Sequence, residues 1–392
     1  MKLVVATTSY PRLDAMHAGI FIAQWRQALE ARGFEVKCLR PAGSVGPTPD
    51  IEYPTWGQLL TGKGAPDHWY ASPILGTISA AIQSASLYKQ VRTHGSTGQL
   101  FVGHWLLPWG LFLPKSIPSH LYAHGSDIAL LEAMPLMCAR QITRRVDSNV
   151  DGITFVSKHL KNRYLALLGR SSNSVLSTVP MGVFDCEPDE EMLRETLAFK
   201  GSKTLAVAMG RHVHLKGLDL LIRSAENVSG LRLLIGGAGA ETAQLRSLAQ
   251  TLNIDVKFTG AFTPSQRCAL LDSADVFIQP SRQVGTRQEG CPVTVLEAIN
   301  QGVPCFLSEI QGHLDLGNQG TIHTFPCDDI GGLAGLLTKL CGDSAFKKRI
   351  QSQAIEFKHS LSWDNQVLRH EAELRRSMGN GAELLKPQSH QI

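Results

Sequence analysis

Short apolar runs alternate with amphipathic stretches along most of the chain, and this alternation limits the fold more than any other feature. A short apolar run is typical of a strand buried on both faces, and the stretches between the runs have helical periodicity. Repeated strand–helix units build a parallel sheet that helices cover. The predicted strands are residues 3–7, 35–39, 100–103, 120–122, 152–155 and 174–177, followed by 205–209, 231–235, 256–259, 276–279, 304–307 and 321–325.

The strands fall into two sets in series, so the sequence predicts two doubly wound α/β domains that face a cleft. The linker between them is expected at residues 179–202, which contain an acidic, turn-rich run at 185–191 together with Pro180 and Pro188. A segment rich in glycine and proline, residues 42–64, is predicted to be a long loop. The predicted helices are residues 18–32, 159–168, 218–225, 240–251, 264–272, 293–300, 329–340 and 363–376.

Composition narrows the class of protein. The chain has 392 residues, 43% of them hydrophobic, and a formal charge of +4. Such a chain is an ordinary globular protein, not a disordered or strongly nucleic-acid-binding one. Its eight cysteines form no C-x-x-C pair, which favours a reducing, cytoplasmic compartment. No apolar run approaches the ~20 residues of a spanning helix, and peripheral contact with the inner face of a membrane stays open.

The most specific motif runs from Glu289 to Glu297. Gly290 and Pro292 interrupt the chain before a helix that is predicted to begin near Val293. A helix N-terminus presents free N–H groups and a positive dipole end to a phosphate. The two glutamates could accept hydrogen bonds from sugar and ribose hydroxyls. Taken one at a time, each glutamate also fits an ordinary acid near a helix start.

A second motif, residues 210–217, follows the predicted strand 205–209 and reads Gly-Arg-His-Val-His-Leu-Lys-Gly. Arg211 offers a planar fork and Lys216 a mobile point charge, and both suit a diphosphate. A third motif, residues 124–127, reads His-Gly-Ser-Asp after the strand 120–122. Its alternative interpretation is a turn with Ser126 or Asp127 as the N-cap of the next helix. Gly19 could let the backbone approach a ligand closely.

With these motifs in both halves and in this order, residues 1–376 resemble the retaining glycosyltransferases of family 4, also called group 1. The resemblance implies the GT-B fold. Residues 1–180 would form a Rossmann-like acceptor-binding domain and residues 181–360 a Rossmann-like domain that binds the nucleotide-sugar donor. Residues 361–376 would form a helix that crosses back to the first domain, and residues 377–392 a disordered tail.

The resemblance also implies roles for the donor side. Glu297 would hold the ribose, Glu289 the transferred sugar, and Arg211 with Lys216 the departing diphosphate. His124 would face the reacting side of the sugar. Donor contacts would further come from Gly19, from Gly260, Ala261 and Phe262 beside the base, and from Gly290, Cys291, Pro292 and Val293 beside the phosphate or sugar. The family often has Phe-Gly where this chain has Cys291-Pro292, and Pro292 lacks an N–H to donate.

The acceptor would lie against the first domain, and its candidate contacts are Tyr10, His17, His104, Trp105 and Asp127. The expected reaction moves a hexose or N-acetylhexosamine, with a UDP-sugar favoured and GDP-mannose as the other donor. The acceptor would be a glycan, a lipid-linked molecule or a small molecule. We expect no metal and no cofactor, because the basic pair can neutralise the leaving group. The alternatives are a nucleotide-sugar epimerase or hydrolase on the same fold, and a non-catalytic nucleotide-sugar-binding protein.

Overall fold

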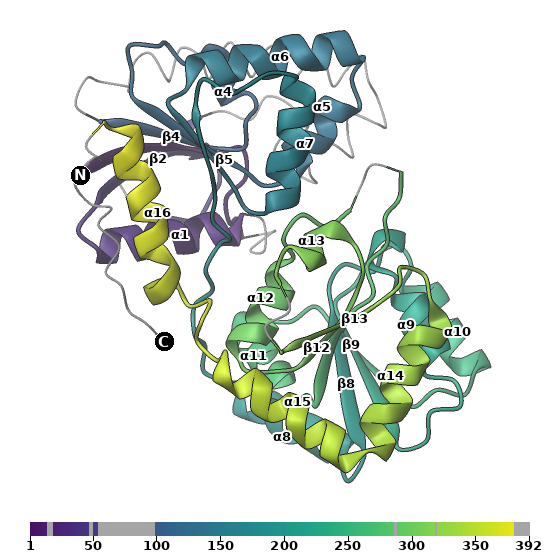
Figure 1. The fold of residues 1–392 in the computed structure, drawn as a ribbon. Helices are drawn as coiled ribbons and strands as arrows, with labels where there is room; N and C mark the ends of the chain where they lie inside the picture. Colours follow the sequence, from purple (N-terminus) through teal and green to yellow (C-terminus); the bar gives the residue numbers. More distant parts are fainter. Residues whose placement is uncertain (14–18, 47–49, 54–98, 286–287, 318–319, 380–392) are drawn as a thin grey trace. The chain divides into compact units, whose positions relative to one another are not determined.

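The computed structural model describes residues 1–13, 19–46, 50–53, 99–285, 288–317 and 320–379 (Figure 1). These residues form two compact units. Unit 1 comprises Met1–Gly182 together with Gln366–Ile392, and unit 2 comprises Val183–Asn365. No helix among the described residues is both long enough and apolar enough to cross a bilayer.

Unit 1 is built on a parallel sheet that has seven strands within the described residues, in the order β3-β2-β1-β4-β5-β6-β7. The order reverses between β1 and β4, so the loops after these two strands diverge at the carboxyl edge of the sheet. The strands are β1 (Lys2–Ala6), β2 (Glu35–Pro41), β3 (Ile51–Tyr53), β4 (Leu100–His104), β5 (Ser119–Ala123), β6 (Gly152–Phe155) and β7 (Val175–Thr178).

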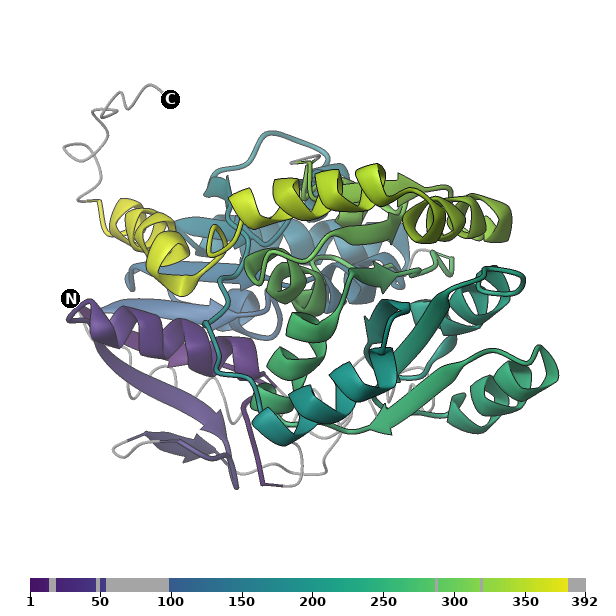
Figure 2. The same ribbon diagram turned by 90° about the horizontal axis from the view of Figure 1, so that it is seen from below.

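Helices cover both faces of this sheet (Figure 1 and Figure 2). One face carries α1 (Ile20–Ala31) and α16 (Trp363–Ser377), and the other carries α4 (Trp109–Phe112), α5 (Ser126–Glu132), α6 (Leu136–Asn149) and α7 (Lys158–Leu168). Both ends of α7 are capped. The Ser157 side chain accepts a hydrogen bond from the amide of Leu160, and Gly169 ends the helix in the left-handed conformation.

The C-terminal helix α16 is fixed to unit 1 by buried polar contacts. His370 lies between the Tyr122 hydroxyl and the Pro180 carbonyl oxygen, 3.1 Å from each. At the rim, Nε of Arg32 donates to Glu371 over 3.1 Å. These contacts explain why the chain returns to unit 1 from Gln366 onward.

Unit 2 has a parallel sheet of six strands among the described residues, in the order β10-β9-β8-β11-β12-β13. Here the order reverses between β8 and β11, which places the loops after those strands at the switch point where such sheets bind ligands. The strands are β8 (Thr204–Met209), β9 (Leu231–Gly236), β10 (Val256–Gly260), β11 (Val276–Gln279), β12 (Cys305–Ser308) and β13 (Ile322–Phe325).

Two apolar clusters sandwich this sheet. The first packs one face against α9 (Leu218–Ser224), α10 (Thr242–Thr251), α14 (Ile330–Gly342) and α15 (Ser344–Glu356). The second packs the other face against α11 (Pro264–Ser273) and α12 (Val293–Asn300). Helix α8 (Glu190–Lys200) lies along α11, and the short helix α13 (Gln311–Leu314) follows β12 (Figure 1).

Every predicted strand is confirmed to within about two residues at its ends. The prediction of a linker over residues 179–202 was wrong in its second half, because residues 190–200 form α8. Asp189 caps that helix by accepting from the amide of Met192, and Glu190 and Glu191 favour the positive end of its dipole. The predicted loop 42–64 contains β3, which pairs with β2, and its remaining residues fall partly outside the described part.

Candidate active site

The loop after β8 is held against the next strand's loop by close backbone contacts. His212 donates its amide to the Ala238 carbonyl oxygen over 3.0 Å, and its ring Nδ1 lies 2.9 Å from Oγ1 of Thr242. A Cβ atom on Gly237 would lie 2.0 Å from the Gly210 carbonyl oxygen. The glycine-rich run 236–239 therefore serves close packing, and it fixes the loop that carries Arg211 and Lys216.

The loops after β8 and β11 meet in an ion pair. Nζ of Lys216 lies 3.0 Å from Oε1 of Glu289, and both side chains are less than a fifth exposed. Burial alone would raise the pKa of Glu289, but the charge and hydrogen bond of Lys216 and the nearby charge of Arg211 lower it below its usual value. Glu289 is therefore a carboxylate at neutral pH. The Arg211 side chain is exposed, so its guanidinium is open to a ligand.

Two residues of α13, Gly312 and His313, lie close to the Glu289 loop. A Cβ atom on Gly312 would lie 1.9 Å from the Glu289 carbonyl oxygen, so only glycine fits at this position. The next residue, His313, is buried, and its Nδ1 lies 2.8 Å from the Ser308 carbonyl oxygen, which fixes Nδ1 as the protonated nitrogen. Burial lowers the pKa of His313 to about 4, so it stays neutral beside Lys216.

Helix α12 begins directly after the loop that contains Glu289. Pro292 is the N-cap residue and Val293 the first helical residue, as predicted. Gly290, Cys291 and Val293 are half-buried, so their amides are near the surface of unit 2. Burial raises the pKa of Cys291 to about 12, which keeps it a neutral thiol. The helix start therefore offers uncharged donors to an anion.

Glu297 does not join the basic pair on the β8 loop. Its Oε1 lies 2.9 Å from Nη2 of Arg267 on α11, and its Oε2 is buried without a hydrogen-bond partner. Burial raises the pKa of Glu297 to about 7, against the opposing charge of Arg267. An unsatisfied buried carboxylate oxygen is costly, and a ligand hydroxyl would relieve that cost.

The candidate base-binding residues follow β10. Gly260 ends that strand, and its carbonyl oxygen accepts from the Gly237 amide over 2.7 Å. The ring of Phe262 covers Gly236, where a Cβ atom would lie 2.8 Å from the ring edge. Ala261 is exposed. The three residues therefore lie at the carboxyl edge of the same sheet as the Lys216–Glu289 pair.

In unit 1, His124 follows β5 and stacks on His104 at the end of β4. Nδ1 of His104 lies 3.0 Å from Nε2 of His124, and the ring planes differ by 15°. Burial lowers the pKa of both histidines, so both rings are neutral and one donates to the other. Phe21 packs on His124 with ring centroids 4.7 Å apart. His124 is half-buried, whereas His104 is fully buried.

Trp105 and Asp127 shape the same loop. Trp105 has a φ of 73°, an unusual value for a bulky residue, and its amide donates to the Tyr122 carbonyl oxygen over 2.8 Å. Asp127 was one of two predicted N-caps of α5, but the N-cap is Gly125 and it has no side-chain cap bond. The Asp127 carboxylate instead accepts from the amides of Leu106, Gly125 and Ile128 at 2.9–3.0 Å. It therefore fixes the loop after β4.

The remaining unit 1 candidates differ in exposure. Gly19 is the left-handed N-cap of α1, where a Cβ atom would lie 2.5 Å from the Ser9 carbonyl oxygen. Tyr10 is buried, and burial raises its pKa to about 12. A buried Tyr10 ring helps to pack the first loop and is not on the surface. His17 falls outside the described residues.

The structure thus brings Lys216 and Glu289 into contact, places Arg211 near them, and pairs Glu297 elsewhere. The sequence interpretation missed Arg267, Gly312 and His313. Gly312 and His313 follow the predicted strand 304–307, so their position at a strand's carboxyl end was the available signal. Arg267 had no such signal, because it lies inside the helix α11 and not at the end of a strand.

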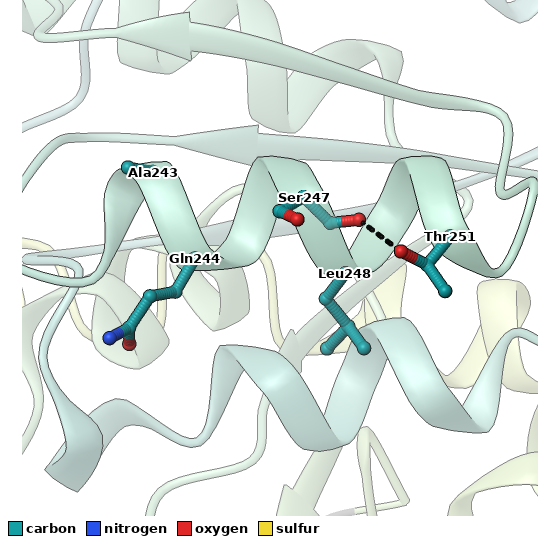
Figure 3. Close-up of a pocket in the computed structure, with 5 residues that line it drawn as sticks. All are labelled: Ala243, Gln244, Ser247, Leu248 and Thr251. Atoms are coloured by element: carbon teal, nitrogen blue, oxygen red, sulfur yellow. Dashed lines mark hydrogen bonds between the residues drawn. The ribbon is translucent and has the colours of Figure 1, made fainter.

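A hollow elsewhere on unit 2 has a different character (Figure 3). It lies along one face of α10 and is lined by Ala243, Gln244, Ser247, Leu248 and Thr251. The Thr251 hydroxyl donates to the Ser247 carbonyl oxygen over 2.9 Å and is thereby occupied. The hollow contains no charged side chain, unlike the Lys216–Glu289 site.

Residues 189–357 match the model of the family described as glycosyl transferases, group 1. This range contains the β8 loop, the Lys216–Glu289 pair and the whole of α12. Unit 2 belongs to the group 1 glycosyl transferases. The match confirms the family that the sequence motifs indicated.

Several curated proteins that the chain resembles are mannosyltransferases. The chain is 29% identical over 217 residues to a GDP-mannose-dependent monoacylated α-(1-6)-phosphatidylinositol monomannoside mannosyltransferase of Corynebacterium glutamicum, covering 52% of this chain and 56% of the relative. It is 32% identical over 193 residues to a GDP-mannose-dependent α-(1-6)-phosphatidylinositol monomannoside mannosyltransferase of Mycolicibacterium smegmatis. This match covers 46% of this chain and 49% of the relative. The chain thus spans about half the length of the first curated relatives that it matches. A phosphatidyl-myo-inositol mannosyltransferase of Mycobacterium leprae is 23% identical over 89% of this chain and 90% of its own.

Solved structures resemble the chain over almost its whole length. Sucrose-phosphate synthase of Thermosynechococcus elongatus superposes with a TM-score of 0.71 at 15% identity, over 97% of this chain and 100% of that one. HepE of Anabaena, solved in complex with UDP, gives a TM-score of 0.69 at 13% identity over 95% and 99%. At such low identity the likeness concerns the fold, and the fold is GT-B.

Proposed function

We propose that this chain is a retaining hexosyltransferase that takes its sugar from a nucleotide-diphosphate donor bound at the carboxyl edge of the unit 2 sheet. The donor phosphates would lie against Lys216, Arg211 and the amides at the start of α12. Glu289 would accept hydrogen bonds from the hydroxyls of the sugar. Glu297 would accept them from the ribose.

The observation that carries this proposal is the ion pair of Lys216 with Glu289 at 3.0 Å. An ammonium group has three N–H donors, and one of them satisfies Glu289. The other donors are available to a phosphate oxygen. The same contact therefore sets a phosphate-binding cation beside a carboxylate suited to hydroxyls, as a nucleotide sugar requires.

In the proposed mechanism, the bond between the anomeric carbon and the diphosphate oxygen breaks while negative charge grows on that oxygen. Preorganised cations at that oxygen lower the barrier, and one such donor is typically worth ~10²–10³ in rate. Lys216 and Arg211 take this part. A leaving phosphate oxygen would accept the proton of the acceptor hydroxyl as the new bond forms on the same face of the sugar. This route retains the anomeric configuration and needs no metal ion.

GDP-mannose is the first donor to test. The sequence interpretation favoured a UDP-sugar, but four of the relatives are named as GDP-mannose-dependent enzymes. Those names also describe phosphatidylinositol monomannoside acceptors, so a glycolipid at a membrane surface is the acceptor class that we favour. A UDP-sugar stays the second choice, since HepE was solved with UDP.

The direct test is an assay of the intact chain with a panel of GDP- and UDP-sugars, with and without a phosphatidylinositol mannoside in detergent. Release of nucleoside diphosphate that depends on the acceptor supports a transferase. Release without acceptor indicates a hydrolase or an epimerase, and binding without turnover indicates a non-catalytic protein. Proton NMR of the product then reads the anomer, and an inverted product or a loss of turnover in EDTA would contradict the mechanism.

A further inference from the structure

Two cysteines of unit 2, distant in sequence, lie next to each other. The Cys268 thiol on α11 donates to the backbone carbonyl oxygen of Cys186 over 2.7 Å. This contact places the Cys268 sulfur atom directly beside Cys186.

A third side chain contacts both sulfur atoms. Nε2 of Gln301, at the end of α12, lies 2.8 Å from Sγ of Cys268 and 3.6 Å from Sγ of Cys186. The Cys268 hydrogen bond lowers the pKa of Cys186, burial opposes this, and the charge of Arg267 lowers it further. The same environment raises the pKa of Cys268. Cys186 is therefore the thiolate-forming member of the pair.

Cys186, the thiolate-forming member, is also the more exposed of the two cysteines. Cys186 is half-buried and Cys268 is buried. The residue before Cys186 is held firmly, because Oδ1 of Asp185 accepts from Asn300 over 2.8 Å and lies 2.9 Å from Nδ1 of His359. An oxidant therefore meets Cys186 first, while Cys268 is positioned behind it. This arrangement is typical of an attacking thiol with a resolving partner.

We propose that Cys186 and Cys268 are a redox modification site that forms a reversible disulfide with a low-molecular-weight disulfide as oxidant. The Cys186 thiolate attacks one sulfur atom of the oxidant, forms a mixed disulfide and releases one thiolate. Cys268 then loses its proton to water, attacks Sγ of Cys186 and releases the second thiolate. The protein loses two hydrogen atoms, and the oxidant is reduced to two thiols. Excess dithiol reverses both steps.

The disulfide would act next to the candidate donor site. Cys268 follows Arg267, whose guanidinium pairs with Glu297, and Gln301 lies one helical turn after Glu297 on the chain. A covalent bond would fix α11 to the segment that precedes α8. The modification itself does not depend on the proposed transferase function, because it is read on the thiols alone.

The test is a peptide map of the intact chain after incubation with oxidised glutathione, acid quenching and alkylation of the remaining thiols. The expected result is a cross-linked pair of peptides containing Cys186 and Cys268, which disappears after treatment with dithiothreitol. The variant Cys268→Ser is expected to retain glutathione on Cys186, since nothing resolves the mixed disulfide. The variant Cys186→Ser is expected to leave Cys268 alkylatable.

The matched control is Cys138→Ser, which removes an exposed thiol of unit 1 and should leave the cross-link unchanged. Two outcomes would overturn the proposal. In one, glutathione modifies Cys138 while Cys186 and Cys268 of the wild type both stay alkylatable. In the other, glutathione remains on Cys186 of the wild type without a cross-link. Both are read on the wild-type chain, so a variant that fails to fold does not prevent the decision.

Discussion

Lys216 and Glu289 form a partly buried ion pair of 3.0 Å at the switch point of the unit 2 sheet, where loops from β8 and β11 meet. The two residues are 73 positions apart in the sequence, so the fold brings them together. Glu289 remains ionised because Lys216 offsets the cost of burying the carboxylate. The pair is therefore preorganised before any ligand arrives.

Replacing Lys216 by alanine is expected to lower kcat/KM with the preferred nucleotide sugar by about 100-fold or more, because it removes a cation at the leaving group. The control is Lys203→Ala, which breaks a 2.9 Å ion pair with Asp255 on the surface of the same unit. The control should retain activity within about twofold. Equal activity of the two variants, measured by nucleoside diphosphate release, would contradict the assigned role of Lys216.

The ionised Glu297 carboxylate is expected to lower the free energy of unfolding of the chain while it serves donor binding. Its pKa is raised from 4.5 to about 7 in the folded chain, so the folded state binds more protons than the unfolded state in this window. The Glu297 contribution to the free energy of unfolding therefore falls as the pH rises through the window. Glu297→Gln should remove this loss and stabilise the chain by up to about 3 kcal/mol above pH 7.

The same variant should bind the donor more weakly, because an amide replaces a carboxylate acceptor. Urea unfolding of the wild type and Glu297→Gln from about pH 5 to 8 gives the difference in unfolding free energy directly. A difference that does not change with pH would show that Glu297 titrates at its ordinary value.

Gly312→Ala is expected to disrupt the site through sterics alone. The added methyl group would lie 1.9 Å from the Glu289 carbonyl oxygen, so the Glu289 loop must move. We expect a destabilisation of about 1–3 kcal/mol and a loss of donor binding. Gly335→Ala in α14 is the control, because nothing lies within 4 Å of its added Cβ. The control should stabilise the helix by about 0.5–1 kcal/mol, and similar effects of the two substitutions in thermal unfolding would refute the steric account.

Buried histidines of unit 1 should make the chain sensitive to acid. Burial lowers the pKa of His120 to about 3 and that of His370 to about 4, from 6.5. Below pH 6.5 the unfolded chain therefore binds protons that the folded chain rejects, and stability falls as the pH falls. His370→Gln should reduce that fall by up to about 3 kcal/mol near pH 4. His214→Gln changes an exposed histidine and should leave this fall in stability unchanged. An identical pH dependence of the unfolding free energy in the two variants would contradict the prediction.

The strands and the position of α12 could be predicted because their signals are local. Short apolar runs and the Pro292–Val293 helix start lie within a few residues of the structure that they specify. Helix α8 could also have been predicted from local signals, because Asp189 is a typical N-cap and Glu190 and Glu191 form a typical acidic first turn. The neighbouring prolines favoured a linker interpretation, and the cap was overlooked.

Side-chain pairing could not be predicted in the same way, because it depends on which loops the sheet order brings together. The sequence placed Glu297 in one group with Glu289, Arg211 and Lys216, but Glu297 pairs with Arg267 from α11. The need for glycine at position 312 likewise depends on the approach of the Glu289 backbone. Neither contact has a signature within a single sequence.

The most direct test of the central claim is a calorimetric titration of the intact chain with GDP-mannose and with UDP-glucose, compared among the wild type, Lys216→Ala and Lys203→Ala. The wild type and Lys203→Ala are expected to bind at least one of the two donors equally well. Lys216→Ala is expected to bind that donor at least about tenfold more weakly, a loss of about 1.4 kcal/mol. Equal affinity of all three proteins for the donor, or no binding of either nucleotide sugar by the wild type, would contradict the account.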